Sequence, residues 1–288
     1  MKLATKIVGM VSMAALLAGS PVIAGETKTF KEKVVVEEEP RQWWNAALST
    51  GWDSLYMFRG VNVLRGNSNY GSGIYWTDLN ATWNITDNDF LTVGSWVGFG
   101  TQNAASGYRE FDAYTTYTHT FGNLSVGLGY TFYYIFSEPE LFSNELNAKI
   151  AYAFEFGGVT ITPSATYYFN LGPDFADAQD QTGIAATASS YLLFRVDGSI
   201  PLYKDIVSLA PWTAFGLNFD YNTRLNGNGS LDQFNGANNL EVGLAIPVRI
   251  NKTITVSGYG AYSYAFYNLG GVTEPSSLWG GAKVTFSF

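Results

Sequence analysis

The sequence contains no cysteine and only one histidine among its 288 residues. The absence of cysteine excludes disulfide bonds, cysteine-ligated metals and a lipid anchor on an N-terminal cysteine. With a single histidine, a cluster of histidine and cysteine metal ligands cannot form either. The chain must therefore be stabilised by packing and hydrogen bonding, without disulfides.

Charged residues are also scarce, at 14% of the chain, where a soluble domain averages about 25%. The net charge of −8 argues against nucleic-acid binding, which needs a basic surface, and no Walker-type phosphate loop is present. Beyond the N-terminal region, no stretch approaches the roughly 20 apolar residues of a membrane helix. The mean hydropathy is +0.01.

Aromatic residues, in contrast, are abundant: they make up 16% of the chain, with 20 Phe, 19 Tyr and 8 Trp. Few charges, many aromatics and no helical span are typical of a transmembrane β-barrel. The strands of such a barrel alternate lipid-facing apolar residues with lumen-facing polar residues, so the mean hydropathy is unremarkable.

The N-terminal region has the pattern of an export signal. A basic start and a short apolar run at residues 7–17 are followed by small residues before Gly25. This pattern predicts a secretory signal peptide over residues 1–24. The charged segment at residues 25–42 is predicted to be a flexible periplasmic tail, with a short β-segment or a partner-binding tail as alternatives.

From Trp43 onward the chain alternates with period two and is interrupted by turn residues. The pattern predicts twelve antiparallel strands over residues 43–288, closed because an open sheet edge in hydrocarbon leaves backbone groups unpaired. Short connections such as "TDND", "FGN" and "NK" alternate with mostly longer ones, such as the loop around "RLNGNGSLDQFNG". Short periplasmic turns and longer outer loops are expected of an outer-membrane barrel, which would place both termini in the periplasm.

The ends of the predicted barrel form its seam. The first strand is predicted over roughly residues 44–60, with Tyr56 and Phe58 on the lipid side. The last strand, ending at Phe288, is predicted to pair with it. A C-terminal aromatic residue on an alternating strand also looks like the signal read by the outer-membrane assembly machinery, so we expect that machinery and outer-membrane lipid as partners.

Two stretches resemble a known family. They are "STGWDSLYMFRGVNVLRG", with its Phe-Arg-Gly core at residues 58–60, and "REFDAYTTYTHTFGNLSVGLGYTFYYIF", which opens with Glu110 and Asp112. Both are similar to segments of the TorF-type porin family, over about the first half of the mature chain. The resemblance implies a small pore-forming barrel in the outer membrane of a Gram-negative-type bacterium, and it supplies no catalytic residues.

Charged residues fall in the inward register of most predicted strands. Unpaired charges are costly to bury dry, so the lumen should hold either water or self-paired ions, and inward Trp76, Trp96 and Trp279 indicate a narrow bore. The pore-lining candidates are Asp53, Arg59, Glu110, Asp112, Glu145, Lys149, Asp220, Glu241 and Lys283.

The only histidine, His119, falls in the outward register beside the turn "FGN", so it is expected to be structural. We therefore expect no catalytic residues, no metal site and no cofactor. The predicted function is passive diffusion of ions or small polar solutes through an outer-membrane porin. The alternative is a non-conducting structural or adhesive barrel.

Overall fold

The computed structural model describes residues 42–64, 73–101, 107–136, 141–172, 188–204, 206–225, 231–266 and 276–288. The expected signal peptide, and all but the last residue of the charged segment that follows it, lie outside these ranges. Within them, no helix combines the length and apolar character needed to cross a membrane.

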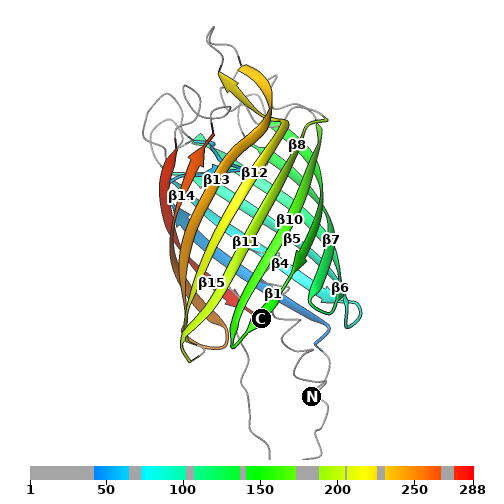
Figure 1. The fold of residues 1–288 in the computed structure, drawn as a ribbon, viewed down its shortest axis with the longest axis vertical. Coiled ribbons are helices and arrows are strands. Elements are labelled where there is room, and N and C mark those ends of the chain that lie inside the picture. Colours follow the sequence, from blue (N-terminus) through cyan, green and yellow to red (C-terminus); the bar gives the residue numbers. More distant parts are fainter. Residues whose placement is uncertain are drawn as a thin grey trace, which may run out of the picture.

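Twelve long antiparallel strands close into a barrel, as the alternation predicts (Figure 1). Closure arises because the first strand pairs with both the second long strand and the last one. In sheet order the barrel strands are β1 (Trp44–Asp53), β4 (Ile74–Asn84), β5 (Asp89–Gly100), β6 (Arg109–Phe121), β7 (Leu124–Ile135), β8 (Leu141–Tyr152), β10 (Val159–Gly172), β11 (Ser190–Tyr203), β12 (Val207–Leu225), β13 (Leu231–Arg249), β14 (Ile254–Ala265) and β15 (Ser277–Ser287).

Three short strands accompany the barrel. β9 (Phe154–Phe156) continues the line of β8 beside β10. β2 (Met57–Phe58) and β3 (Val61–Asn62) pair with each other in a separate sheet.

The break between β8 and β9 lies opposite a proline. On β10, Ser164 still pairs with β8, whereas Ile161 pairs with β9, and the ladder between them is interrupted. Pro163 lies in this interval. Because proline has no N–H to donate, an interruption is expected here.

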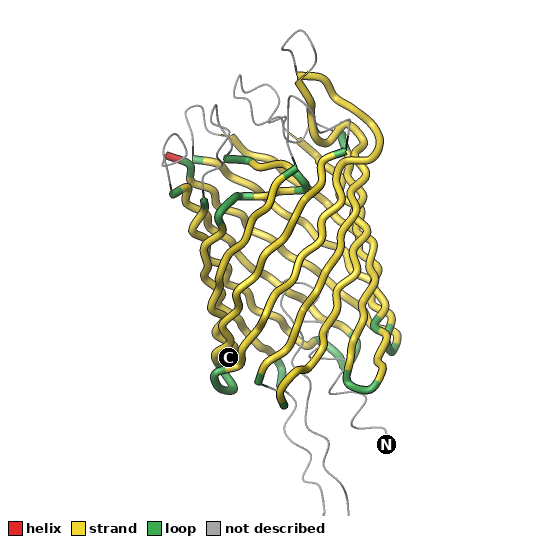
Figure 2. Tube along the Cα trace, turned by 60° about the vertical axis from the view of Figure 1, so that its left-hand side comes forward, coloured by secondary structure: helices red, strands yellow, loops and turns green. Residues whose placement is uncertain are grey.

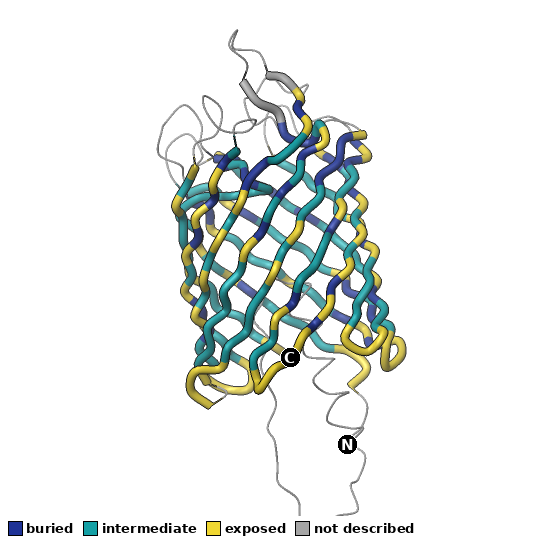
Figure 3. Tube along the Cα trace, viewed as in Figure 1, coloured by how far each residue is buried: buried dark blue, intermediate teal, exposed yellow. Residues whose placement is uncertain are grey.

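The outer face of the barrel is apolar along the middle of the strands. Leu79, Leu128 and Ile150 expose 52%, 66% and 50% of their surface. Residues of the opposite register face the lumen, where the buried hydroxyls of Thr82 and Thr92 share a 2.8 Å hydrogen bond. Figure 3 shows this alternation of exposure along the strands. Such a belt matches the lipid-facing surface of a membrane barrel.

Exposed aromatic pairs lie near both ends of this belt. Trp44 pairs with Trp83 across β1 and β4 at one end, and Tyr75 pairs with Phe99 across β4 and β5 at the other. All four side chains are exposed. Aromatic girdles at the two membrane interfaces have this placement.

The two ends of the barrel differ in their connections. The end where β1 begins and β15 ends, here called the terminal end, has short turns (Figure 2). The opposite end, the loop end, carries the longer connections. The loop predicted at "RLNGNGSLDQFNG" is mostly strand instead, because β12 and β13 each run for 19 residues and project beyond the rim (Figure 2).

The predicted seam is confirmed. β1 and β15 pair from Ala47–Ser287 to Asp53–Gly281. At its end, the Phe288 N–H donates to the Ala46 carbonyl at 2.9 Å, and the Ala46 N–H donates to the Phe288 carbonyl at 3.2 Å.

The predicted length of the first strand is wrong. β1 ends at Asp53, and the chain that follows turns into the lumen instead of continuing along the wall. Tyr56 and Phe58, predicted to face lipid, pack against Trp96 of β5 and Tyr133 of β7, in a cluster that also holds residues of β4, β11 and β12. A single short segment can reach strands so far apart in the sheet only from inside the barrel.

Candidate functional site: the lumen and its inturned hairpin

Residues 54–64, here called the inturned hairpin, enter the lumen at the loop end. Ser54 begins the segment and stays on the wall: its N–H donates to the Gly280 carbonyl at 2.8 Å, and its hydroxyl accepts from the Gly280 N–H at 3.0 Å. β2 and β3 then pair through two residue pairs, Met57–Asn62 and Phe58–Val61.

The tip of the hairpin is a two-residue turn made by Arg59 and Gly60. Their φ angles are +49° and +82°, which match a type I′ turn. Glycine fits the second position because an added Cβ would collide with the side chain of Asn239. Arg59 holds a left-handed conformation that costs an L-residue roughly 1–2 kcal/mol, so its contacts must offset this strain.

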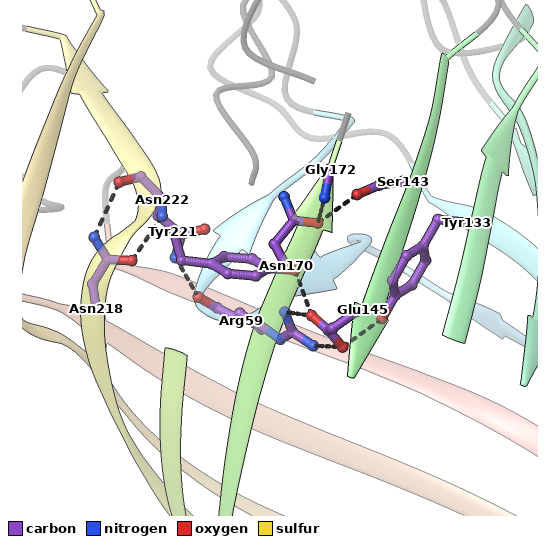
Figure 4. Close-up of polar contacts among 9 residues, drawn as sticks. All are labelled: Arg59, Tyr133, Ser143, Glu145, Asn170, Gly172, Asn218, Tyr221 and Asn222. Carbon is purple, nitrogen blue, oxygen red and sulfur yellow. Dashed lines mark hydrogen bonds and ion pairs between the residues drawn. The ribbon is translucent and has the colours of Figure 1, made fainter. Parts of the chain in front are cut away.

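Arg59 is anchored by Glu145 of β8 (Figure 4). Both terminal guanidinium nitrogens donate to the carboxylate, with Nη2 2.6 Å from Oε1. The same carboxylate accepts the Tyr133 hydroxyl at 3.1 Å and the Tyr221 hydroxyl at 2.8 Å. The side chains of Arg59 and Glu145 are 8% and 1% exposed. Removing one partner from such a buried pair is strongly destabilising, because it leaves the other charge uncompensated.

Aromatic rings surround the same guanidinium. The Arg59 Cζ lies 3.9 Å from the ring centroid of Tyr168, 4.4 Å from Tyr221 and 5.7 Å from Tyr191. These distances are within the range of cation–π attraction. Glu145, Tyr133, Tyr168, Tyr191 and Tyr221 are together called the Arg59 cage below.

The backbone of the tip is held by asparagines of β12 and β13. The Arg59 carbonyl accepts from the amide of Asn222 at 3.2 Å and from that of Asn238 at 2.8 Å. The pairing of β12 with β13 shifts register at this level, where Asp220 has a φ of +59°. Asn218 stabilises this bulge by accepting the Asn222 N–H at 2.7 Å. Bulges commonly re-aim side chains, and this one directs Tyr221 and Asn222 to the hairpin.

The base of the hairpin packs on the opposite part of the wall. Tyr56 stacks on Trp96 with centroids 5.6 Å apart and lies against Tyr108. Its hydroxyl interacts with Glu110, and burial raises the pKa of the Tyr56 phenol, so that it stays a neutral donor. Glu110 and the neighbouring Asp112 are themselves buried. Packed side chains therefore occupy the loop end of the lumen.

Below the hairpin, the candidate Asp53 and a further acidic residue, Asp78, lie on one stretch of wall. Asp53 accepts a hydrogen bond from the Tyr259 hydroxyl, and Asp78 accepts one from the Tyr114 hydroxyl at 2.8 Å. Lys283 lies in the same inward register, and both carboxylates attract its ammonium group. Among the residues that the structure describes, no ion pair of 4.0 Å or less joins Lys283 to either acid.

The facing stretch of wall carries a second polar group. Glu241 accepts the Trp212 indole N–H at 2.8 Å, and the Arg195 guanidinium lies 5.5 Å from the Trp212 ring centroid. Arg195 also pairs with Asp197 at 2.8 Å. Asp197 attracts the ammonium group of Lys149 on β8.

The structure thus brings Arg59 and Glu145 into one ion pair, places Glu110 and Asp112 beside the hairpin, and leaves the other candidates along the wall. Asp220 lies at the bulge and accepts from the Asn235 amide at 2.8 Å, at an exposed position. The sequence reasoning missed the tyrosines of the cage and the asparagines behind the tip. The Arg-Gly dipeptide between short β-prone stretches was the one signal of a tight turn.

No protein-family model and no curated protein matches this sequence. Solved structures do. An outer membrane channel from Pseudomonas putida F1 aligns with a TM-score of 0.57 and 9% identity, covering 90% of this chain and 100% of that chain. The NanC porin aligns with a TM-score of 0.50 and 11% identity, covering 84% of this chain and 98% of that chain. LpxR from Salmonella typhimurium aligns with a TM-score of 0.51 and 9% identity, covering 83% of this chain and 99% of that chain. The chain therefore has the fold of the porin-like outer-membrane β-barrels.

Proposed function

We propose that this protein is an outer-membrane channel for passive diffusion of ions or small polar solutes, and that the inturned hairpin restricts its loop end. The observation that carries the proposal is the set of charged lumenal side chains below the hairpin. Asp53, Asp78 and Lys283 form no ion pair within the described part of the chain. Charges of a dry interior need close pairing, so these side chains favour a lumen that holds water.

The fold and the sequence together support a more specific assignment, to the TorF-type porin family. The Phe-Arg-Gly core that carries the resemblance forms the tip of the inturned hairpin. The short turns at the terminal end support periplasmic termini. In this assignment residues 1–24 are a signal peptide, residues 25–42 a periplasmic segment and residues 43–288 the barrel, which contacts outer-membrane lipid.

The position of His119 supports a non-enzymatic role. Its Nδ1 lies 2.6 Å from the Asp89 carboxylate, and its ring packs 4.3 Å from Phe121 between centroids. This group lies at the terminal end, beside the turn between β6 and β7. Histidine there helps to fix a turn and has no connection to the polar lumen.

The inturned hairpin favours a second candidate function, a non-conducting structural or adhesive barrel, because it fills the loop end. Single-channel recording in planar bilayers separates the two. We expect small conductance steps from the full-length mature protein. We expect larger steps from a variant in which a short Gly-Ser linker replaces residues 55–63. No steps from either protein, with both correctly folded, would rule out the channel.

A further inference from the structure

We infer that the Arg59 cage is a recognition site for guanidinium-bearing solutes, and that the chain's own Arg59 occupies it in this structure. The inference rests on the proposed channel function, since solutes must reach the lumen. It assigns a ligand class to a site that otherwise only fixes the hairpin.

The cage belongs entirely to the barrel wall. Its five members lie on five strands that are consecutive in the sheet, namely β7, β8, β10, β11 and β12. The hairpin contributes the guanidinium and the ring of Phe58, whose centroid lies 4.6 Å from the Arg59 Cζ. The wall therefore keeps the five members of the cage when the Arg59 side chain is removed.

The binding groups are positioned independently of Arg59. The Tyr133 and Tyr221 hydroxyls hold the two carboxylate oxygens of Glu145. The Tyr191 hydroxyl donates to the Asn239 side chain at 3.0 Å. Ring centroids of Tyr191 lie 6.4 Å from Tyr168 and 6.0 Å from Tyr221, so the three rings form a continuous surface. A site preorganised in this way loses little entropy when a ligand enters.

The geometry selects guanidinium over ammonium. A guanidinium group is planar, donates in parallel to both oxygens of a carboxylate and stacks on aromatic faces. The cage offers one carboxylate with both oxygens directed at the ligand and ring faces at 3.9 and 4.4 Å from the bound carbon. An ammonium group would meet the charge but not the bidentate and stacked contacts.

The tethered Arg59 competes with a free solute for the cage. The hairpin's own ladder has two residue pairs, and two-stranded hairpins of this kind are marginal alone, so its position depends on its contacts with the wall, among them the stacking of Tyr56 on Trp96. A covalently tethered group has an effective concentration of at least the order of millimolar. A free guanidinium solute must therefore exceed that concentration in the wild type, but not once the Arg59 side chain is removed.

The test uses the full-length protein with Arg59→Ala, recorded in planar bilayers. Methylguanidinium is the probe and methylammonium the matched control. We expect methylguanidinium to reduce the current in Arg59→Ala at concentrations at least about tenfold lower than those needed in the wild type. These concentrations should also be at least about tenfold lower than the methylammonium concentrations needed in either protein. Adding Glu145→Gln should abolish the difference between the probes. Equal effects of the two probes, or a difference that survives Glu145→Gln, would overturn the inference.

A second measurement separates this inference from the channel function. Thermal unfolding of Arg59→Ala in detergent should shift upward with methylguanidinium and not with methylammonium. If the variant binds the probe but carries no current, the channel proposal fails and the cage assignment stands. If it conducts but neither measurement distinguishes the probes, the cage assignment fails alone. Should Arg59→Ala not fold, Arg59→Gln takes its place in both measurements.

Discussion

Tyr56 of the inturned hairpin lies face to face with Trp96 of β5, with ring centroids 5.6 Å apart and ring planes inclined by 19°. The tip of the same hairpin is bound by Glu145 of β8. The hairpin is therefore attached to two separate parts of the wall, by stacking at its base and by a buried ion pair at its tip. Between the two contacts it lies across the loop end of the lumen.

Removing the tip contact should enlarge the conducting path. Arg59→Ala deletes the ion pair and the ring contacts, and loss of one partner of a buried pair costs about 3–5 kcal/mol. We expect the single-channel conductance of Arg59→Ala to exceed that of the wild type severalfold. The control is Arg109→Ala, which removes an exposed arginine at the start of β6. The same conductance in both variants would show that the hairpin does not limit the current.

The chain turns into the lumen after Ser54, and the sequence alone does not predict this turn. Tyr56 and Phe58 continue the apolar alternation of β1, and alternation alone cannot distinguish lipid from the packed interior of a lumen. What decides their position is a partner far along the chain, Glu145, together with the bulge at Asp220. Neither contact leaves a local signal.

The barrel itself was predictable because each strand carries its own evidence. Lipid on one side and polar groups on the other impose period two on every strand, as in β7, where Leu128 is exposed and Gly129 faces inward against Asn147. Closure follows from the lack of backbone partners in hydrocarbon. Each of the twelve strands can thus be recognised from its own residues, whereas the position of the hairpin depends on contacts between distant residues.

The acidic pair beside the hairpin should determine ion selectivity. Arg59 neutralises Glu145, which leaves Glu110 and Asp112 as the acidic residues that border the hairpin. Charge at a constriction selects the opposite ion, and the low-dielectric wall focuses its field. We expect a cation preference in reversal-potential measurements under a salt gradient, and Glu110→Gln with Asp112→Asn should lower it.

Glu155→Gln is the control for this prediction, because Glu155 is exposed on β9 at the terminal end of the barrel, away from the hairpin. The preference should weaken at high salt, as the Debye length falls to about 3 Å at 1 M. An anion-selective wild type, or an unchanged reversal potential in the double variant, would exclude the acidic pair as the selectivity element.

Close packing of lumenal rings on glycine should limit stability. An added Cβ at Gly94 would overlap the Tyr114 ring, whose hydroxyl donates to Asp78 at 2.8 Å. Overpacking of this kind costs about 1–3 kcal/mol, so Gly94→Ala should lower the melting temperature. An added Cβ at Gly127 would lie 3.4 Å from its nearest neighbours, so Gly127→Ala should leave the melting temperature nearly unchanged. Thermal unfolding in detergent followed by circular dichroism compares the two, and equal melting temperatures would contradict the argument.

The C-terminal residue should control assembly more than an equally exposed aromatic residue elsewhere. Phe288 and Phe136 expose 61% and 50% of their surface, so both are expected to contact lipid or its interface. Only Phe288 also closes the barrel, through its two backbone hydrogen bonds with Ala46. Phe136 lies at the loop end, where its N–H donates to the Arg109 carbonyl at 2.9 Å.

Deleting Phe288 should therefore reduce the amount of protein inserted in the outer membrane far more than Phe136→Ser does. Phe288→Ser keeps the backbone bonds of the seam and removes only the ring. A defect in this variant would support recognition of the aromatic side chain by the assembly machinery. The measurement is the yield of folded barrel in membrane fractions, detected by its altered gel mobility before and after heating. If all three variants insert as well as the wild type, the terminal residue is neither a required seam element nor an assembly signal, because spontaneous closure of the remaining β1–β15 pairs would then be sufficient.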